Sequence, residues 1–227
     1  SDGLVLSVSM FPHLKDLKGR TLITSNGDTI LGADDKAGVA EIMTMAERVL
    51  TENIPHGQIS IGFTPDEEVG RGADHFDVEK FDADFAYTMD GDTEGEIQYE
   101  NFNAADAIFE IKGVNVHPGS AKDVMVNAAL VAMEINAALP EGETPADTED
   151  YEGFYHLVSM SGDVACAKLH YIVRDHDTDK FAARLETLKE ISKQMNLKWG
   201  LGTVKLTIDE QYRNMAEIIK DGNMHLI

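Results

Sequence analysis

The stretch Gln58-Ile-Ser-Ile-Gly-Phe-Thr-Pro-Asp-Glu-Glu68 decides the class of fold. Its first seven residues form a β-like run, and three acidic residues follow shortly after that run. Upstream, a β-like run at 21–25 precedes a helical pattern whose apolar residues share one broad face: Val39, Ile42, Met43, Met45, Ala46, Val49 and Leu50. A third short run covers 85–89. Strands that alternate with a helix predict an α/β layer, in which functional groups gather at the carboxyl ends of the strands.

Acidic clusters stand where the three predicted strands end. They are Asp34 with Asp35, Asp66 with Glu67 and Glu68, and Asp90 with Asp92. Parallel strands would bring these carboxylates to one edge, where they repel each other unless a cation neutralises them. Zinc, manganese and magnesium all accept carboxylate ligands, so the pattern predicts a divalent metal site. The alternative for Asp34 or Asp35 is capping of the helix that begins near Ala37.

A second domain follows residue 101. Strand-like runs at 104–112, 154–160, 165–173 and 203–208 alternate with helical patterns at about 122–139 and 178–195. The order β-α-β-β-α-β is the ferredoxin-like plan. We therefore expect a partial catalytic α/β domain over 1–101, an inserted ferredoxin-like lid or dimerisation domain over 102–210, and a return to the first domain over 211–227. So few strands close an α/β layer poorly, which indicates an internal fragment of a longer protein.

Composition narrows the class of protein further. The formal net charge is −22, with 41 acidic against 19 basic residues, which argues against nucleic acid and anionic membranes as partners. The sequence contains no apolar run of the length that crosses a bilayer. Its single cysteine, Cys166, cannot form an internal disulfide, and its apolar surroundings predict a buried side chain. These features predict a cytoplasmic protein.

Four motifs resemble the co-catalytic zinc exopeptidase family, and within it the aminopeptidases that cleave tripeptides. They are Gly32-Ala-Asp-Asp-Lys-Ala-Gly38, Gly62-Phe-Thr-Pro-Asp-Glu-Glu-Val-Gly-Arg-Gly72, Tyr87-Thr-Met-Asp90 and Val116-His-Pro-Gly119. The similarity runs along essentially the whole chain, including the inserted domain. It implies release of the N-terminal residue of a tripeptide by water that two zinc ions activate.

The resemblance assigns roles to the acidic residues. Asp34 bridges the two zinc ions, Glu68 ligates one zinc and Asp90 the other, while Glu67 is the general base. The base must be free of metal in order to accept a proton, which explains why two adjacent glutamates are needed. The family also implies a cis peptide bond between Asp34 and Asp35.

The inserted domain supplies the expected substrate contacts and, by the same resemblance, the contact surface of a homodimer. His117 would stabilise the oxyanion of the tetrahedral intermediate, against the alternative of an exposed turn histidine. Arg174 would grip the C-terminal carboxylate of the substrate, against the alternative of a surface ion pair with Asp175 or Asp177. Asn103 and Asn127 are further candidate polar contacts.

The sequence departs from the family pattern at the terminal zinc ligands. The family uses two further histidines, and none of the eight histidines here lies in a matching context. We therefore expect two zinc ions in the intact enzyme, and magnesium, calcium or no metal in this chain alone, which would be inactive. Two alternatives remain open: an N-acyl amino acid deacylase of the same family, and a non-catalytic lid or dimerisation module.

Overall fold

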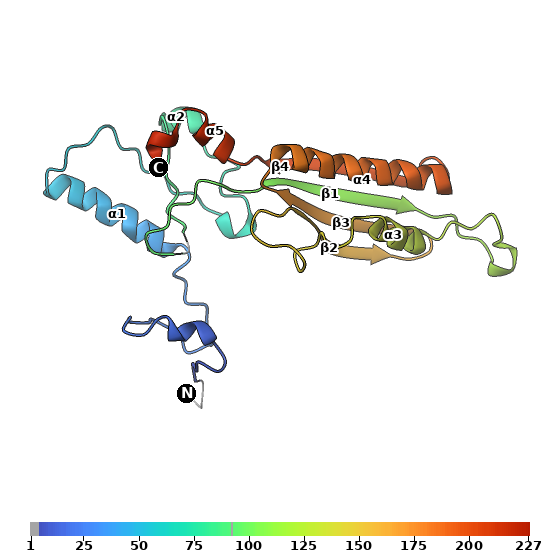
Figure 1. The fold of residues 1–227 in the computed structure, drawn as a ribbon, viewed down its shortest axis with the longest axis horizontal. Helices are drawn as coiled ribbons and strands as arrows, with labels where there is room; N and C mark the ends of the chain where they lie inside the picture. Colours follow the sequence, from blue (N-terminus) through green and yellow to red (C-terminus); the bar gives the residue numbers. More distant parts are fainter. Residues whose placement is uncertain (1–4, 92) are drawn as a thin grey trace. The chain divides into compact units, whose positions relative to one another are not determined.

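A four-stranded antiparallel sheet in the order β2-β3-β1-β4 organises the second part of the chain (Figure 1). The computed structural model describes residues 5–91 and 93–227 and divides into two units, Ser1–Glu96 and Ile97–Ile227. The second unit contains β1 (Asn103–Lys112), α3 (Ala128–Ala137), β2 (Phe154–Gly162), β3 (Cys166–Asp175), α4 (Thr178–Trp199), β4 (Val204–Tyr212) and α5 (Ala216–Lys220), with 3₁₀ turns at Pro118–Ser120 and Met224–Leu226. The predicted β-α-β-β-α-β order is confirmed.

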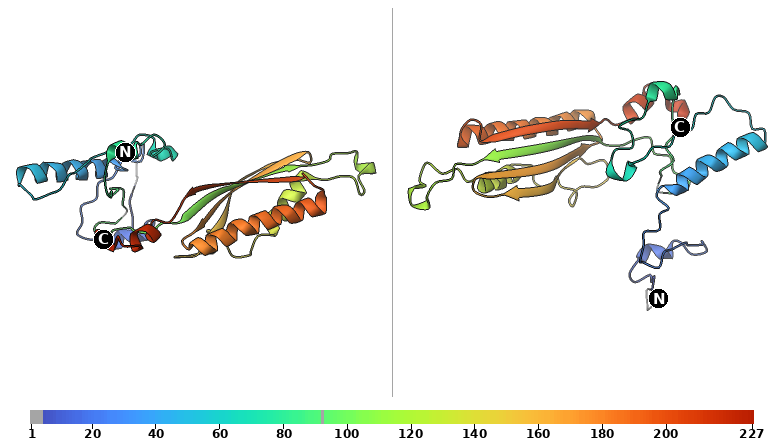
Figure 2. Two further views of the ribbon diagram at one scale, coloured as in Figure 1. Left: turned by 90° about the horizontal axis from the view of Figure 1, so that it is seen from above. Right: turned by 180° about the vertical axis from the view of Figure 1, so that it is seen from behind.

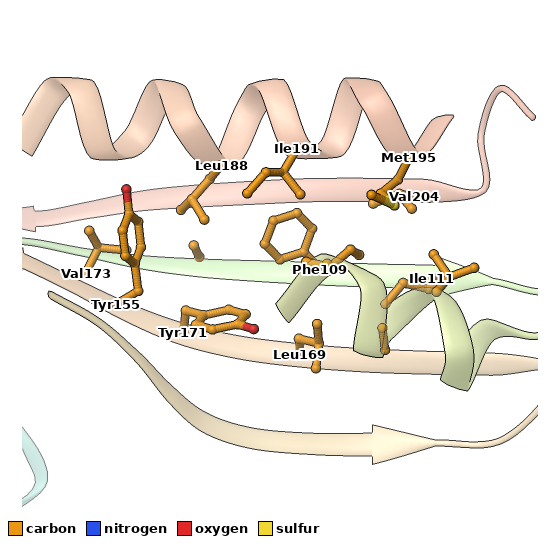
Figure 3. Close-up of a cluster of buried hydrophobic side chains, with 14 of the residues drawn as sticks. Phe109, Ile111, Tyr155, Leu169, Tyr171, Val173, Leu188, Ile191, Met195 and Val204 are labelled. Atoms are coloured by element: carbon orange, nitrogen blue, oxygen red, sulfur yellow. The ribbon is translucent and has the colours of Figure 1, made fainter. Parts of the chain in front are cut away.

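Both long helices of this unit cover one face of the sheet (Figure 2). Alternate strand residues point toward them, and the core between the layers contains Ala105, Ala107, Phe109, Ile111, Leu169, Tyr171, Val173, Phe181, Leu185, Leu188 and Ile191. The rings of Phe109 and Tyr171 meet edge to face with centroids 6.1 Å apart (Figure 3). Each fully buried large side chain contributes about 1.5–3 kcal/mol, so this layer stabilises the unit. The intervening strand residues occupy the opposite, helix-free face.

Helix α3 begins at Ala128, about six residues later than the pattern predicts. Asp123 has a φ of 59°, a left-handed conformation that interrupts a right-handed helix. Val126 forms an isolated antiparallel bridge with Val114, which commits its backbone to a partner outside the helix. Asn127 then caps the helix through its side chain. The apolar periodicity upstream of residue 128 therefore belongs to a loop.

The first unit contains α1 (Lys36–Thr51), the short helix α2 (Val78–Phe81) and 3₁₀ turns at Pro12–Lys15 and Glu67–Val69. The α/β class is confirmed for the chain, but the three strands predicted at 21–25, 58–64 and 85–89 are absent from the described part of this unit. A β-like segment becomes a strand only when a ladder of backbone hydrogen bonds joins it to a neighbour, and no such ladder includes these segments in the part of the chain that the structure describes. Apolar side chains of these segments are accordingly exposed, including Ile23, Ile59 and Phe85.

Residues 211–227 group with the second unit, in which the N–H of Asn214 donates to Asn103 Oδ1 at 3.0 Å. Their return to the first domain stays a prediction. The expectation of a buried Cys166 differs from the structure. Cys166 is exposed, since strand alternation places it outside the core that its neighbour Ala167 joins. No helix among the described residues has the length and apolar character to cross a membrane.

Candidate functional site

Asp35, and not Asp34, caps the first long helix. The Asp35 Oδ1 atom accepts a hydrogen bond from the backbone N–H of Gly38 at 2.9 Å, at the start of α1. The peptide bond between Asp34 and Asp35 is cis, as the family resemblance implies. The Asp34 carboxylate is exposed and makes no hydrogen bond or ion pair with a described residue. The capping alternative therefore holds for Asp35 and leaves Asp34 available to a ligand.

The start of α1 contacts the segment that ends in Asp90. Gly38 is the one buried residue of the helix, and a Cβ atom at this position would lie 1.8 Å from the carbonyl oxygen of Met89. Only glycine permits this approach. Two of the quoted motifs, 32–38 and 87–90, therefore meet in the structure although no sheet joins them. Asp90 is exposed next to this contact.

Glu67 and Glu68 lie on a tight 3₁₀ turn. Left-handed residues bound the turn on both sides, Asp66 with φ 63° and Gly70 with φ 72°. The N–H of Gly70 donates to the carbonyl oxygen of Glu67 at 2.7 Å, which closes the turn. Both glutamates are exposed, and the nearby Arg71 is paired with Asp74 at 2.9 Å rather than with either of them. The two carboxylates are thus available for separate tasks.

The structure does not assemble the predicted ligands into a closed metal site. Among the described residues, no group of three or more His, Cys, Asp or Glu side chains is placed so that it could hold a metal ion. Asp92, which the sequence placed in the third cluster, lies outside the described residues. The chemistry of the donors nevertheless fits a divalent cation, because Asp34, Glu68 and Asp90 are exposed carboxylates that form no ion pair with a described residue. Convergence of these three residues remains a prediction.

Asn103 has a structural position in the second unit. It is fully buried, and its Nδ2 atom donates to the carbonyl oxygens of Asp175 at 3.1 Å and His176 at 3.2 Å. Its Oδ1 atom accepts the N–H of Asn214 at 3.0 Å. The side chain therefore ties the first residue of β1 to the chain that leaves β4. These bonds already occupy both ends of the amide.

His117 and Asn127 both cap local structure. The Nδ1 atom of His117 accepts the N–H of Gly119 at 3.1 Å, and the ring is exposed. The Oδ1 atom of Asn127 accepts the N–H groups of Ala129 and Leu130 at 3.1 and 3.3 Å. These bonds leave His117 Nε2 and Asn127 Nδ2 available for other contacts.

Arg174 does not form a surface ion pair with Asp175 or Asp177, which was the alternative to a role in substrate binding. Its Nη1 atom donates to the carbonyl oxygens of Val173 at 2.9 Å and Ala105 at 3.3 Å, and its guanidinium carbon lies 5.6 Å from the centre of the Tyr212 ring. Asp175 instead pairs with Arg184 at 2.7 Å. Arg174 is a half-buried cation with no carboxylate partner among the described residues. Sequence reasoning missed Tyr212, because nothing in the pattern indicates which face of the sheet it occupies.

Two protein-family models match the chain. The model described as M42 glutamyl aminopeptidase matches residues 17–138, which is more than half of the chain. The model described as peptidase dimerisation domain matches residues 99–200. The second match lies within the second unit and includes β1, α3, β2, β3 and α4, but ends before β4.

Curated relatives match essentially the whole chain. Peptidase T of Clostridium perfringens (strain ATCC 13124) is 55% identical over 227 residues, which cover 100% of this chain and 56% of that protein. Peptidase T of Desulfitobacterium hafniense (strain DCB-2) is 55% identical over 225 residues, covering 99% of this chain and 55% of that protein. The chain thus spans about half the length of the curated relatives it matches.

Two solved structures resemble this chain in fold. Aminopeptidase PepT from Bacillus cereus ATCC 10987 matches with a TM-score of 0.72 and 27% identity, covering 89% of this chain and 57% of that one. A tripeptidase from Staphylococcus aureus Mu50 shares the fold, with a TM-score of 0.67 and 23% identity over 89% of this chain and 57% of that one.

Proposed function

The chain belongs to the co-catalytic zinc exopeptidase family alongside peptidase T, and from this premise we propose that it provides the catalytic carboxylates and the lid of a metal-dependent tripeptide aminopeptidase. The observation that carries the proposal is the difference between the two adjacent aspartates at the start of α1. Asp35 caps the helix, while the exposed carboxylate of the preceding Asp34 makes no hydrogen bond or ion pair with a described residue.

Each acidic residue has a task in the proposed reaction. Asp34, Glu68 and Asp90 would hold a pair of zinc ions, which when bound would supply an activated water and polarise the scissile carbonyl. Glu67 accepts a proton from the attacking water and delivers it to the leaving amine as the C–N bond breaks. The exposed turn at 67–69 suits this proton transfer, because no cationic side chain among the described residues pairs with Glu67.

The lid residues would bind the rest of the substrate. Because His117 Nδ1 accepts a backbone N–H, the neutral imidazole carries its proton on Nε2, which can donate to the oxyanion. Arg174 offers Nε and Nη2 to the C-terminal carboxylate of the peptide, since Nη1 is already bonded to two carbonyl oxygens. We further propose a cytoplasmic homodimer that forms through the second unit, in line with the dimerisation-domain match.

A chimeric enzyme tests this proposal. The 227 residues replace the matched part of the Clostridium perfringens peptidase T, and hydrolysis of a tripeptide is compared with that of a dipeptide and an N-acetyl amino acid. We expect release of the N-terminal residue from the tripeptide alone. Hydrolysis of the N-acetyl amino acid instead would support the deacylase alternative and overturn the proposal.

Two substitutions in the chimera separate the roles of the adjacent glutamates. Glu67→Gln should lower kcat at least about 100-fold while bound metal, measured by elemental analysis, stays unchanged. Glu68→Gln should release metal. The reverse pattern would show that the two roles are exchanged, and unchanged turnover in both variants would exclude this pair from the reaction.

A further inference from the structure

The last residues of β4 contain a β-bulge. Glu210 pairs with Ala105 of β1, whereas Tyr212 pairs with Ala104. Gln211 between them is therefore an extra residue without a partner of its own on β1. A bulge of this kind re-aims the side chains that follow it, and bulges are common beside functional sites.

The bulge decides which face of the sheet Tyr212 occupies. Ile208 packs against the core under the helices, and regular alternation over four residues would send Tyr212 to the same face. Tyr212 pairs with Ala104 instead, and paired residues share a face of the sheet. Ala105 belongs to the core, so its neighbour Ala104, and Tyr212 with it, lie on the opposite face. Arg174 pairs with Ala104 from the opposite side and lies on this helix-free face as well.

Arg174 and Tyr212 meet across one small residue. Their strands, β3 and β4, both flank β1, and the methyl side chain at Ala104 is fully buried between them. The Arg174 guanidinium carbon lies 5.6 Å from the Tyr212 ring centre, within the range of a cation–π contact. The same guanidinium is bonded through Nη1 to two backbone carbonyls. The Tyr212 ring and the two backbone carbonyls thus fix the position of the guanidinium, while its Nε and Nη2 atoms stay available for a ligand.

We propose that Tyr212 is a positioning residue that holds the Arg174 guanidinium ready for the C-terminal carboxylate of a peptide substrate. The proposal rests on the role given to Arg174 above. An arginine side chain has several rotatable bonds, and ordering them at the moment of binding costs affinity. A ring that orders them beforehand lowers this cost and acts on substrate binding rather than on bond cleavage.

Tyr212 is half-exposed, and no hydrogen bond joins its hydroxyl to a described residue. The argument therefore concerns its ring and not its hydroxyl. Tyr212→Phe keeps the ring and Tyr212→Leu removes it at similar bulk. This pair of variants separates positioning by the ring from simple filling of space.

The contact itself is measured on the 227-residue chain by NMR. The Nε–Hε resonance of Arg174, assigned through Arg174→Lys, should shift in Tyr212→Leu and stay in place in Tyr212→Phe. An unshifted resonance in Tyr212→Leu would overturn the proposal, because the ring would then not hold the guanidinium.

The role is measured in the chimeric enzyme with a tripeptide and its C-terminal amide. We expect Tyr212→Leu to raise KM for the free acid about three- to tenfold, with kcat nearly unchanged and KM for the amide unaffected. Tyr212→Phe should match the parent. Equal effects on acid and amide, or none on either, would overturn the proposal. If Arg174→Ala leaves the ratio of acid to amide unchanged, the carboxylate role of Arg174 fails and this inference fails with it, whereas tripeptide hydrolysis by the parent still supports the proposed function.

Discussion

Gly38 and Met89 are in such close contact that a Cβ atom at position 38 would lie 1.8 Å from the Met89 carbonyl oxygen. This contact links the motif that contains Asp34 to the motif that ends in Asp90. Substitution of Gly38 tests the contact, because helix propensity and the steric clash change the stability of the helix in opposite directions.

Gly38→Ala should destabilise the contact between α1 and residues 85–90. Helix propensity alone predicts stabilisation by about 1 kcal/mol for this change in a helix. The clash predicts a loss of about 1–3 kcal/mol, because the carbonyl oxygen belongs to the backbone and moves only with the segment. Hydrogen exchange of the α1 amides measures the sign. Gly57→Ala is the control, since its Cβ atom meets nothing within 4 Å; slower exchange in Gly38→Ala would contradict the contact.

Asp35→Ala should weaken the start of α1 by about 0.5–2 kcal/mol, the usual value of a lost N-cap. Asp34→Ala should leave the helix unchanged, since the Asp34 carboxylate caps nothing. The same hydrogen-exchange measurement on residues 36–40 compares the two variants in the metal-free chain. Equal losses of helix stability in the two variants would mean that both carboxylates cap the helix. That result would contradict a separate role of Asp34 as a metal ligand.

Asp175→Ala should destabilise the second unit by about 3–5 kcal/mol. Asp175 is fully buried and Arg184 nearly so, and Arg184 also pairs with Glu143. Removing one partner leaves a buried charge with reduced compensation. The exposed pair of Lys193 and Glu190 is the control, since Lys193→Ala should cost at most about 1 kcal/mol. Urea denaturation followed by circular dichroism measures both, and similar midpoints for the two variants would contradict the structural role of Asp175.

The ferredoxin-like unit was predictable from the sequence, whereas the assembly of the site was not. Local alternation and helix periodicity place Phe109 and Leu188 in one core, because burial within this unit agrees with the local pattern. The strand predicted at 58–64 has the right residues, such as Ile59 and Phe63, but no neighbouring strand among the described residues of its unit. Nor does residue pattern reveal a bulge such as that at Gln211. The position of Tyr212 therefore comes from the structure alone.

The second unit should lose stability at alkaline pH through Tyr171. Burial raises the pKa of this phenol to about 12, and its hydroxyl donates to Asn136 Oδ1 at 2.9 Å. The unfolded chain releases the proton near pH 10, so the contribution is complete below that value and is lost as the pH rises toward 12. A shift of about two units corresponds to roughly 2–3 kcal/mol.

Tyr171→Phe should flatten this part of the curve of unfolding free energy against pH, measured by urea denaturation from pH 7 to pH 12. It should also cost about 1 kcal/mol at neutral pH through the lost hydrogen bond. Tyr151→Phe, at a residue 63% exposed, should leave the alkaline slope in place. An unchanged slope in Tyr171→Phe would show that the alkaline loss arises elsewhere; Tyr155, whose pKa burial also raises, is the next residue to test.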